Sequence, residues 1–300
     1  MTTSNGLLLI DKPKGLTSHD VVAGVRKILN ERRVGHAGTL DPMATGLLVL
    51  GVGPSTRLLR FAQCGVKRYT GTVRLGVATD SLDADGALTE RMPVPHLSSD
   101  EMNAAAARMT GRQTQVPPMV SAIKVGGRRL HEMAREGLEV EREPREITVS
   151  SFFLQPSDDD GRWNFEVECT VGTYVRVLLS DLARRIGTVG HLSALRRISS
   201  GSLHVDQAVS LEQLSELVKA GSSPLLPAAA FVTDLERTVL SADQERRIRM
   251  GQRIEVSGSF ASLEIAAFNA QGVLVAILHP RGENWKPELV LPIEPAGAHG

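Results

Sequence analysis

Cysteine is scarce in this sequence, which has only Cys64 and Cys169 among its 300 residues. Two cysteines cannot build the disulfide framework of a small secreted domain, and neither has a second cysteine nearby, as zinc sites usually do. Both lie in apolar segments. We therefore expect two buried free thiols in a reducing compartment.

An excess of charge of either sign is also absent, because 34 lysines and arginines balance 34 aspartates and glutamates. A protein that coats long nucleic acid usually has a clear basic excess. The balance therefore argues against DNA packaging, but it leaves room for a local basic groove.

Long hydrophobic runs are missing too. The N-terminal apolar run covers only residues 7–10, which is too short for a signal peptide. No run approaches the roughly 18–20 residues of a membrane-spanning helix. We therefore expect a cytoplasmic protein without membrane contact. Since no additional apolar surface stands out, we also expect a monomer that requires no protein partner.

Cofactor and metal motifs are absent as well. The chain has no Walker loop, no G-x-G-x-x-G sequence opening a helix and no H-E-x-x-H or C-x-x-C pattern. Asp80, Asp83 and Asp85 resemble the start of a calcium loop, but its twelfth position would be Arg91 instead of glutamate. We predict a solvated acidic turn there, and neither a metal ion nor a cofactor.

The sequence does contain helical and strand-like segments in mixed order, which indicates an α+β fold. Strand patterns occur at residues 6–10, 47–52 and 69–77, and residues 147–154 and 163–170 form a predicted hairpin. Ser18 is the predicted N-cap of a helix that ends near Leu29.

A boundary between two domains is predicted at residues 221–227, which contain two prolines and two serines. The predicted domains are residues 1–225 and 228–300. Strand-like stretches near 252–256, 262–268 and 272–278 make the second domain small and β-rich.

Residues 32–46 form a predicted loop that holds the strongest candidate for a functional residue. Asp41 stands between Leu40 and Pro42, where a carboxylate with few polar neighbours needs a cationic partner or a chemical task. Capping the turn that Pro42 begins is an equally ordinary role for an aspartate. His36 in the same loop is ambiguous in the same way, because a lone loop histidine is usually structural or solvated.

Four basic pairs lie beside glycines or aromatic residues, at positions 32–33, 67–68, 128–129 and 196–197. Each pair alone predicts a solvated surface, whereas together they suit phosphate contacts around a pocket. The only tyrosines are Tyr69 and Tyr174. An enzyme that extracts a base from folded RNA needs an aromatic face for stacking, although a core tyrosine with a satisfied hydroxyl is the simpler interpretation.

Seven motifs in this chain occur in the order found in the TruB family of tRNA pseudouridine synthases, which the chain therefore resembles over about residues 6–205. The motifs are KPKGLTS (12–18), RRVGHAGTLDPMATGLL (32–48), KRYTGTVRLG (67–76), TDSLDADG (79–86), SAIKVGGRRLHEMAREG (121–137), GTYVRVLLSDL (172–182) and LRRISSG (195–201). Such a set in register is highly specific, whereas the C-terminal region matches weakly.

The resemblance implies a pseudouridine synthase fold, which has a central mixed, mainly antiparallel sheet flanked by helices and a small C-terminal PUA-like RNA-binding β domain. It implies that Asp41 is the catalytic aspartate, that Tyr69 stacks on the target base and that Arg176 pairs with the catalytic carboxylate.

Three further positions match residues of the family that contact the substrate. His36 matches a histidine that orders the flipped-out nucleotides, and Tyr174 and Leu195 match residues that line the uridine pocket.

The function implied by the resemblance is conversion of the T-loop uridine at tRNA position 55 to pseudouridine. The partner would be the T-arm of tRNA, and no cofactor is implied. The alternative is a non-catalytic tRNA-binding folding chaperone, which the same basic pairs would serve. Asp41, Tyr69 and Arg176 together favour the enzyme, because binding alone needs no buried carboxylate beside the RNA.

Overall fold

The computed structural model describes residues 5–63, 65–121, 123–130, 133, 136–138, 140–158 and 161–293. Cys64 lies outside the described residues, so only Cys169 bears on the predicted thiols. Cys169 is a buried free cysteine, as expected, and burial raises the pKa of its thiol to about 11.

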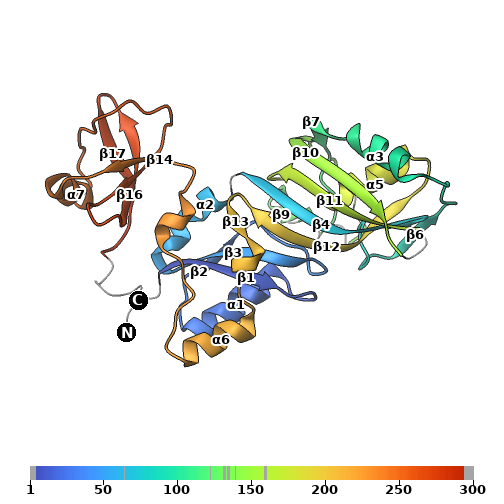
Figure 1. Ribbon diagram of the computed structural model, residues 1–300, viewed down its shortest axis with the longest axis horizontal. Coiled ribbons are helices and arrows are strands. Elements are labelled where there is room, and N and C mark those ends of the chain that lie inside the picture. The colour runs from blue at the N-terminus through green and yellow to red at the C-terminus, as the bar shows by residue number, and fades with distance from the viewer. Residues whose placement is uncertain are drawn as a thin grey trace.

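A nine-stranded mixed sheet forms the frame of the molecule (Figure 1). Its strands follow the order β1-β3-β12-β4-β11-β10-β7, with β2 paired to β3 and β13 paired to β12. Only β3 and β12 pair in parallel, and the other pairs of this sheet are antiparallel. The strands are β1 (Gly6–Lys12), β2 (Val34–Ala37), β3 (Thr45–Val52), β4 (Val66–Leu75), β7 (Gly111–Gln115), β10 (Arg145–Pro156), β11 (Arg162–Thr170), β12 (Gly190–Ser200) and β13 (Leu203–His204).

The N-terminal strands of this sheet are buried on both faces. Helices α1 (Ser18–Leu29) and α6 (Leu211–Lys219) share a core with Leu8 and Ile10 on one face of β1. Leu7 and Leu9 lie in a different core on the other face. Because successive side chains of a strand point to opposite faces, burial of both faces explains the uninterrupted apolar runs at residues 7–10 and 47–50.

The other half of the sheet is covered on one face only. Helix α3 (Ser99–Ala107) packs on β10, and α5 (Val175–Arg185) packs on β12. Buried and more exposed side chains alternate along β11 accordingly, with Phe165 and Val167 in the core and Glu166 exposed between them. The antiparallel pairing of β10 with β11 confirms the predicted hairpin.

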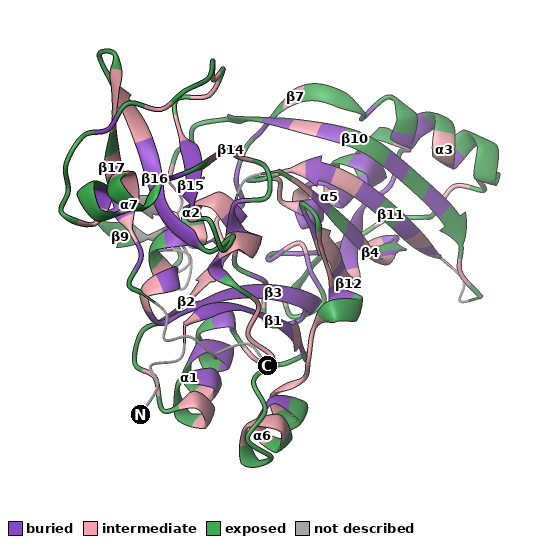
Figure 2. Cartoon of the chain, turned by 60° about the vertical axis from the view of Figure 1, so that its left-hand side comes forward, coloured by how far each residue is buried: buried purple, intermediate pink, exposed green. Residues whose placement is uncertain are grey.

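A four-stranded sheet near the C-terminus has the order β14-β15-β16-β17 and lies to the side of the large sheet, with α2 (Leu59–Ala62) between the two sheets (Figures 1 and 2). Its elements are β14 (Glu236–Val239), α7 (Ala242–Arg249), β15 (Ile265–Phe268), β16 (Leu274–Arg281) and β17 (Asn284–Val290). One hydrophobic core joins Leu7 and Leu9 of β1 to Ala266, Phe268 and Ile277 of this sheet. The two sheets therefore contribute to one buried apolar cluster, which Ala62, Ala228 and Phe231 also join.

Short elements complete the described part of the chain. They are η1 (Gly53–Leu58), α2 (Leu59–Ala62), β5 (Val77–Thr79), β6 (Leu88–Arg91), β8 (Lys124–Val125), β9 (Arg128–Arg129), η2 (Val205–Gln207) and η3 (Ala228–Phe231). Among the described residues, no helix has both the length and the apolar character needed to cross a membrane.

Three sequence-based expectations about these elements were wrong. The N-cap of α1 is Thr17, whose hydroxyl accepts from the Asp20 N–H at 3.1 Å, so Ser18 is free for another task. Residues 34–37, expected in a loop, pair with β3 as β2. Residues 252–256 form no strand, since Ile254 makes only a single bridge to Trp285, whereas the unpredicted β14 pairs in parallel with β15.

Candidate active site

The segment between β2 and β3 carries Asp41, and buried side chains hold it from two sides. The Ser18 hydroxyl accepts from the Leu40 N–H at 2.9 Å and donates to the Leu40 carbonyl at 3.2 Å. The Lys12 ammonium donates to the carbonyls of Ala44 at 2.6 Å and Pro42 at 3.3 Å. Asp41 therefore stands between two fixed points of the backbone.

Lys12 is fully buried, with 0% of its surface exposed. Burial lowers the pKa of its ammonium from 10.5 to about 8, and the negative charge of Asp41 opposes this shift. A lysine in such a place acts as a donor for loop carbonyls that helix or sheet pairing leaves unsatisfied.

Arg197 closes the same segment from β12. Its Nε donates to the Leu47 carbonyl at 2.6 Å, and its Nη2 donates to the Gly38 carbonyl at 3.1 Å. These carbonyls lie on either side of the Asp41 segment, so one guanidinium ties its beginning to its end. Gly46 faces Arg197 at the parallel contact of β3 and β12, and it has no room for a side chain, because a Cβ there would lie 2.3 Å from the Arg197 carbonyl oxygen.

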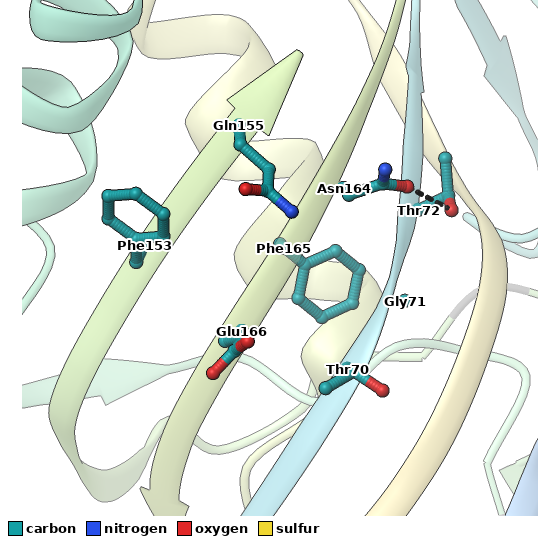
Figure 3. A pocket seen from close by; sticks show the side chains of 8 residues that line it. All are labelled: Thr70, Gly71, Thr72, Phe153, Gln155, Asn164, Phe165 and Glu166. Carbon is teal, nitrogen blue, oxygen red and sulfur yellow. Dashed lines mark hydrogen bonds between the residues drawn. The ribbon is translucent and has the colours of Figure 1, made fainter. Parts of the chain in front are cut away.

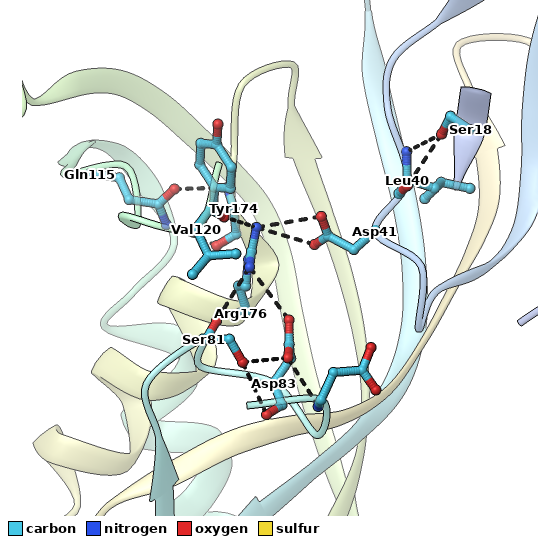
Figure 4. A network of polar contacts seen from close by, with 10 residues as sticks. Ser18, Leu40, Asp41, Ser81, Asp83, Gln115, Val120, Tyr174 and Arg176 are labelled. Carbon is cyan, nitrogen blue, oxygen red and sulfur yellow. Dashed lines mark hydrogen bonds and ion pairs between the residues drawn. The ribbon is translucent and has the colours of Figure 1, made fainter. Parts of the chain in front are cut away.

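Asp41 meets Arg176 in the folded chain (Figure 4). Both carboxylate oxygens of Asp41 lie 3.4 Å from Nη2 of Arg176. Arg176 projects from the first turn of α5 and is only 3% exposed. This ion pair, which the family resemblance suggested, joins two positions 135 residues apart.

Three other groups hold the guanidinium of Arg176. Its Nη2 donates to the Val120 carbonyl at 2.7 Å, and its Nη1 donates to the Ser81 carbonyl at 3.3 Å and contacts Asp83 Oδ2 at 3.4 Å. The Asp83 carboxylate itself accepts from the Ser81 hydroxyl at 2.5 Å. A planar fork with this many acceptors has one orientation, and that orientation aims Nη2 at Asp41.

The pKa of the Asp41 carboxyl is raised above its usual value by burial, which disfavours the charged form. The positive charge of Arg176 opposes this rise, and the negative charge of Asp83 adds to it. The Asp41 side chain keeps 34% of its surface accessible, in contrast to 4% for Arg176. Arg176 is therefore the buried support, and Asp41 is the group that a ligand can reach.

A cavity of about 280 Å³ opens at Asp41 and Arg176, and Tyr69, Tyr174 and Leu195 also line it. Tyr69 comes from β4 and Leu195 from β12, whereas Tyr174 is the N-cap residue of α5. The structure thus brings together five of the six site residues expected from the sequence.

Each tyrosine of the cavity is held in place. The backbone of Tyr174 is fixed by Gln115, which accepts from its N–H at 2.8 Å and donates to its carbonyl at 3.1 Å. Tyr69 is buried, and burial raises the pKa of its phenol. The Tyr69 hydroxyl therefore stays protonated, and its ring is the apolar wall of the cavity.

His36 is the sixth expected residue, and it is not among the residues that line this cavity. It lies on β2 with its ring 5.5 Å from that of His19, in an edge-to-face arrangement. Burial lowers the pKa of His36, so its imidazole is neutral near pH 7.

Asp83, Lys67 and Arg197 also belong to the site. The expected solvated turn was wrong for Asp83, and of the two interpretations of the basic pairs, the solvated surface was wrong for Lys67 and Arg197. The exposed fractions of the three residues are 5%, 6% and 1%. For Asp83 the sequence contained only a weak signal. The Ser81 hydroxyl, two residues earlier, can bond to a buried carboxylate, but a serine at this spacing is just as common in an exposed turn. For the two cations nothing in the local sequence separates them from their exposed neighbours Arg68 and Arg196, which pair with Glu168 and Asp11.

A second hollow, of about 300 Å³, lies along β4, β10 and β11 (Figure 3). It is lined by Thr70, Gly71, Thr72, Phe153, Gln155, Asn164, Phe165 and Glu166. Its only charged side chain is the carboxylate of Glu166, and it has no cation to orient that group. The Asp41 cavity, in contrast, combines a carboxylate, an oriented arginine and an aromatic wall, and it is the candidate active site.

Comparison with known proteins identifies the family. The family described as "TruB family pseudouridylate synthase (N terminal domain)" matches residues 26–175, a range that includes Asp41, Tyr69 and Tyr174. The chain belongs to the TruB family. A second family description, "tRNA pseudouridylate synthase B C-terminal domain", matches residues 176–245. The resemblance drawn from the seven motifs is thereby confirmed.

Relatives in the TruB family match nearly the whole chain. A tRNA pseudouridine synthase B of Thermobifida fusca (strain YX) is 42% identical over 294 residues, which covers 96% of this chain and 98% of that protein. The protein of the same name from Streptococcus thermophilus (strain CNRZ 1066) is 39% identical over 292 residues and is covered to 99%.

The TruB fold is shared with more distant proteins. A chain in the solved structure titled "Crystal Structure of a Cbf5-Nop10-Gar1 Complex" superimposes with a TM-score of 0.75 at 23% identity, covering 96% of this chain and 85% of that one. At this identity the likeness concerns the fold alone. The predicted α+β fold, with its mixed, mainly antiparallel sheet and a small C-terminal sheet, is confirmed.

Proposed function

We propose that this protein is a tRNA pseudouridine synthase that isomerises the T-loop uridine at position 55. The observation that carries the proposal is the Asp41 carboxylate, which is desolvated, accessible from a cavity and oriented by a buried arginine at 3.4 Å. The TruB relatives, which match nearly full length and are named tRNA pseudouridine synthase B, support tRNA as the substrate.

The proposed reaction needs only one reactive carboxylate. The C1′–N1 bond of the nucleotide breaks, the uracil turns, and C1′ bonds to C5 instead. The hydrogen of C5 leaves to solvent, and N1 gains a proton, so atoms balance without a cofactor. Asp41 acts as the nucleophile or as the base, and both roles require its ionised form.

The ion pair with Arg176 favours the ionised form of the Asp41 carboxyl. Burial alone would favour the protonated acid, and the guanidinium opposes that shift. The uridine of a folded T-loop is stacked, so it must flip into the cavity, where the Tyr69 ring offers it an apolar face. Tyr174 and Leu195 complete the proposed uridine pocket, and we assign His36, outside the cavity, to the neighbouring flipped-out nucleotides.

The remaining assignments follow from this function. Residues 1–225 would form the catalytic domain and residues 228–300 the PUA-like RNA-binding domain, and the enzyme would act as a cytoplasmic monomer on the T-arm. The alternative of a non-catalytic folding chaperone is not favoured, because RNA binding alone gives no reason for a desolvated carboxylate fixed by a buried arginine.

The test is conversion of a bare T-arm hairpin by the purified protein. A hairpin that carries tritium at C5 of its uridines should release the label to solvent, and the product should contain pseudouridine at position 55. A hairpin with cytidine at that position is the control and should release nothing. Binding of the first hairpin without conversion would contradict the proposal.

A further inference from the structure

Lys67 is a largely buried cation on the wall of the Asp41 cavity. It lies near the start of β4, is 6% exposed, and lines the cavity together with Asp41 and Tyr69. Among the described residues, no carboxylate pairs with its ammonium, and no carbonyl accepts from it. Nζ of Lys67 is not among the fully buried polar atoms that lack a partner, so the ammonium can be reached from the cavity, and a ligand that displaces its water must replace that contact.

A second buried cation lies beside Lys67. A Cβ placed on Gly38 would be 2.6 Å from Nζ of Lys67 and 3.4 Å from Nη1 of Arg197, so these nitrogens are no more than about 6 Å apart. Nη1 of Arg197 is buried and makes no hydrogen bond of normal geometry in the described part of the chain, although the Tyr69 hydroxyl lies close enough to the guanidinium for its pKa to be affected. Two like charges at this distance repel each other in a site of low polarity.

Among the described residues, cations outnumber carboxylates around the cavity. Lys12, Lys67, Arg176 and Arg197 bring four cations, whereas Asp41 and Asp83 bring two carboxylates, and the charge of the exposed Asp85 also acts on Asp41. Asp41 and Asp83 both contact Arg176, so neither pairs with Lys67 or Arg197. In keeping with this, burial and the charge of Arg197 lower the pKa of Lys67 to about 8.

A single anionic oxygen would supply the partner that the Lys67 ammonium lacks among the described residues. Uracil and ribose are neutral, and the only anions that RNA carries are its phosphodiester groups. Gly38 has no side chain, and this makes room for the ammonium itself, because a Cβ there would lie 2.6 Å from Lys67 Nζ. Gly38 and Lys67 both line the cavity that would receive the target base.

We propose that Lys67, backed by Arg197, binds a non-bridging oxygen of a phosphodiester that flanks the flipped nucleotide. This inference rests on the proposed function. It assigns Lys67 to substrate binding and gives the buried Arg197 a role beyond fixing the Asp41 segment. A phosphate held there would fix the ribose of the target relative to Asp41, since the phosphate and C1′ belong to the same nucleotide.

The test is a cycle of protein and RNA changes. T-arm hairpins would carry one neutral methylphosphonate, at the linkage 5′ or 3′ of the target uridine. Dissociation constants would be measured with the full chain in an Asp41→Asn background, with and without Lys67→Met. Arg68→Met is the matched control, because Arg68 is the adjacent cation on β4 but is exposed and paired with Glu168.

We expect one of the two methylphosphonates to weaken binding about ten-fold or more, as loss of a hydrogen bond to a charged group does. In the Lys67→Met variant, the same methylphosphonate should weaken binding less than about two-fold. In the Arg68→Met variant, it should weaken binding as much as it does without either substitution. Lys67→Met should also reduce the salt dependence of binding by roughly one phosphate contact.

Two results would overturn the inference. The first is a methylphosphonate that costs the same with and without Lys67→Met. The second is that neither methylphosphonate weakens binding to the Asp41→Asn protein. This measurement needs no lysine variant, so it stays decisive even if Lys67→Met and Lys67→Gln fail to fold. Conversion of the natural hairpin by the unmodified protein is measured in parallel, so failure of the proposed function is recognised separately.

Discussion

Arg176 and Asp83 lie 93 positions apart in the sequence and meet inside the protein, with Nη1 of the arginine 3.4 Å from Oδ2 of the aspartate. Both side chains are almost fully buried. The other terminal nitrogen of the same guanidinium faces Asp41. Arg176 therefore connects a buried carboxylate that anchors it to an accessible carboxylate that it orients.

Asp83→Asn should lower the single-turnover rate while leaving RNA affinity nearly unchanged. Without the charge at Asp83 the guanidinium is held less firmly, and misplacement of a catalytic contact by about 1 Å costs on the order of 100-fold. Asp85→Asn is the control, because Asp85 belongs to the same turn but is exposed. Equal rates for both variants would show that Asp83 does not position Arg176.

Asp41→Asn should abolish pseudouridine formation and leave RNA binding intact. It should also raise the free energy of unfolding at pH 7, because the pKa of Asp41 is higher in the folded chain than its usual 3.8. Between those two pKa values the folded protein binds more protons than the unfolded one, so ionisation of Asp41 lowers stability as pH rises. The stability gain should shrink as pH falls toward 4 in urea titrations. A variant that is less stable than wild type at pH 7 would contradict this account.

Arg176→Met should move the pH–rate profile to higher pH. The guanidinium lowers the pKa of Asp41 and burial raises it, so its removal leaves the acid form favoured. A nearby opposite charge shifts a carboxyl by about 1–3 pKa units, so the rate at mildly acidic pH should fall roughly 10- to 1000-fold and recover in part as pH rises. Arg176→Lys should restore only part of the rate, since an ammonium cannot reproduce the fork. Superimposable profiles at saturating RNA would rule out the ion pair as a functional contact.

Lys12→Met should lower the free energy of unfolding by about 1–3 kcal/mol, the cost of leaving a buried carbonyl without a donor. That carbonyl belongs to Ala44, on the segment that carries Asp41, whereas the Pro42 carbonyl also accepts from the Gly15 N–H at 2.8 Å. Lys14→Met is the control, because Lys14 is exposed two residues away. Equal denaturation midpoints for the two variants would show that the Lys12 contacts contribute little.

Deletion of residues 228–300 should destabilise the remaining chain rather than release an independent catalytic part. The deleted region supplies Phe231, Phe268 and Ile277 to the core that covers Leu7 and Leu9, and burial of each large apolar side chain stabilises by roughly 1.5–3 kcal/mol. The melting temperature of the truncated chain is the measurement. A value equal to that of the full chain would show that the shared core contributes little to stability.

The local elements and the family can be predicted from the amino-acid sequence alone. The apolar runs of β1 and β3, the alternation along β11 and the capping box of Ser98 with Glu101 depend on neighbours within a few residues, so their patterns are legible in the chain. Seven motifs in register identified the family, and through it Asp41, Tyr69 and Arg176.

Which charged residues are buried, and which groups they meet, depends on contacts between distant parts of the chain. Lys67 and Arg68 are adjacent in the sequence, yet one lines the cavity and the other pairs with Glu168 on the surface. Side chains of a strand alternate between faces, and the groups that surround Lys67 include Arg176 of α5 and Arg197 of β12, which are far away in the sequence. Long-range packing of this kind leaves no local pattern, so the burial of Asp83 and the meeting of two cations beside Gly38 could be known only from the folded chain.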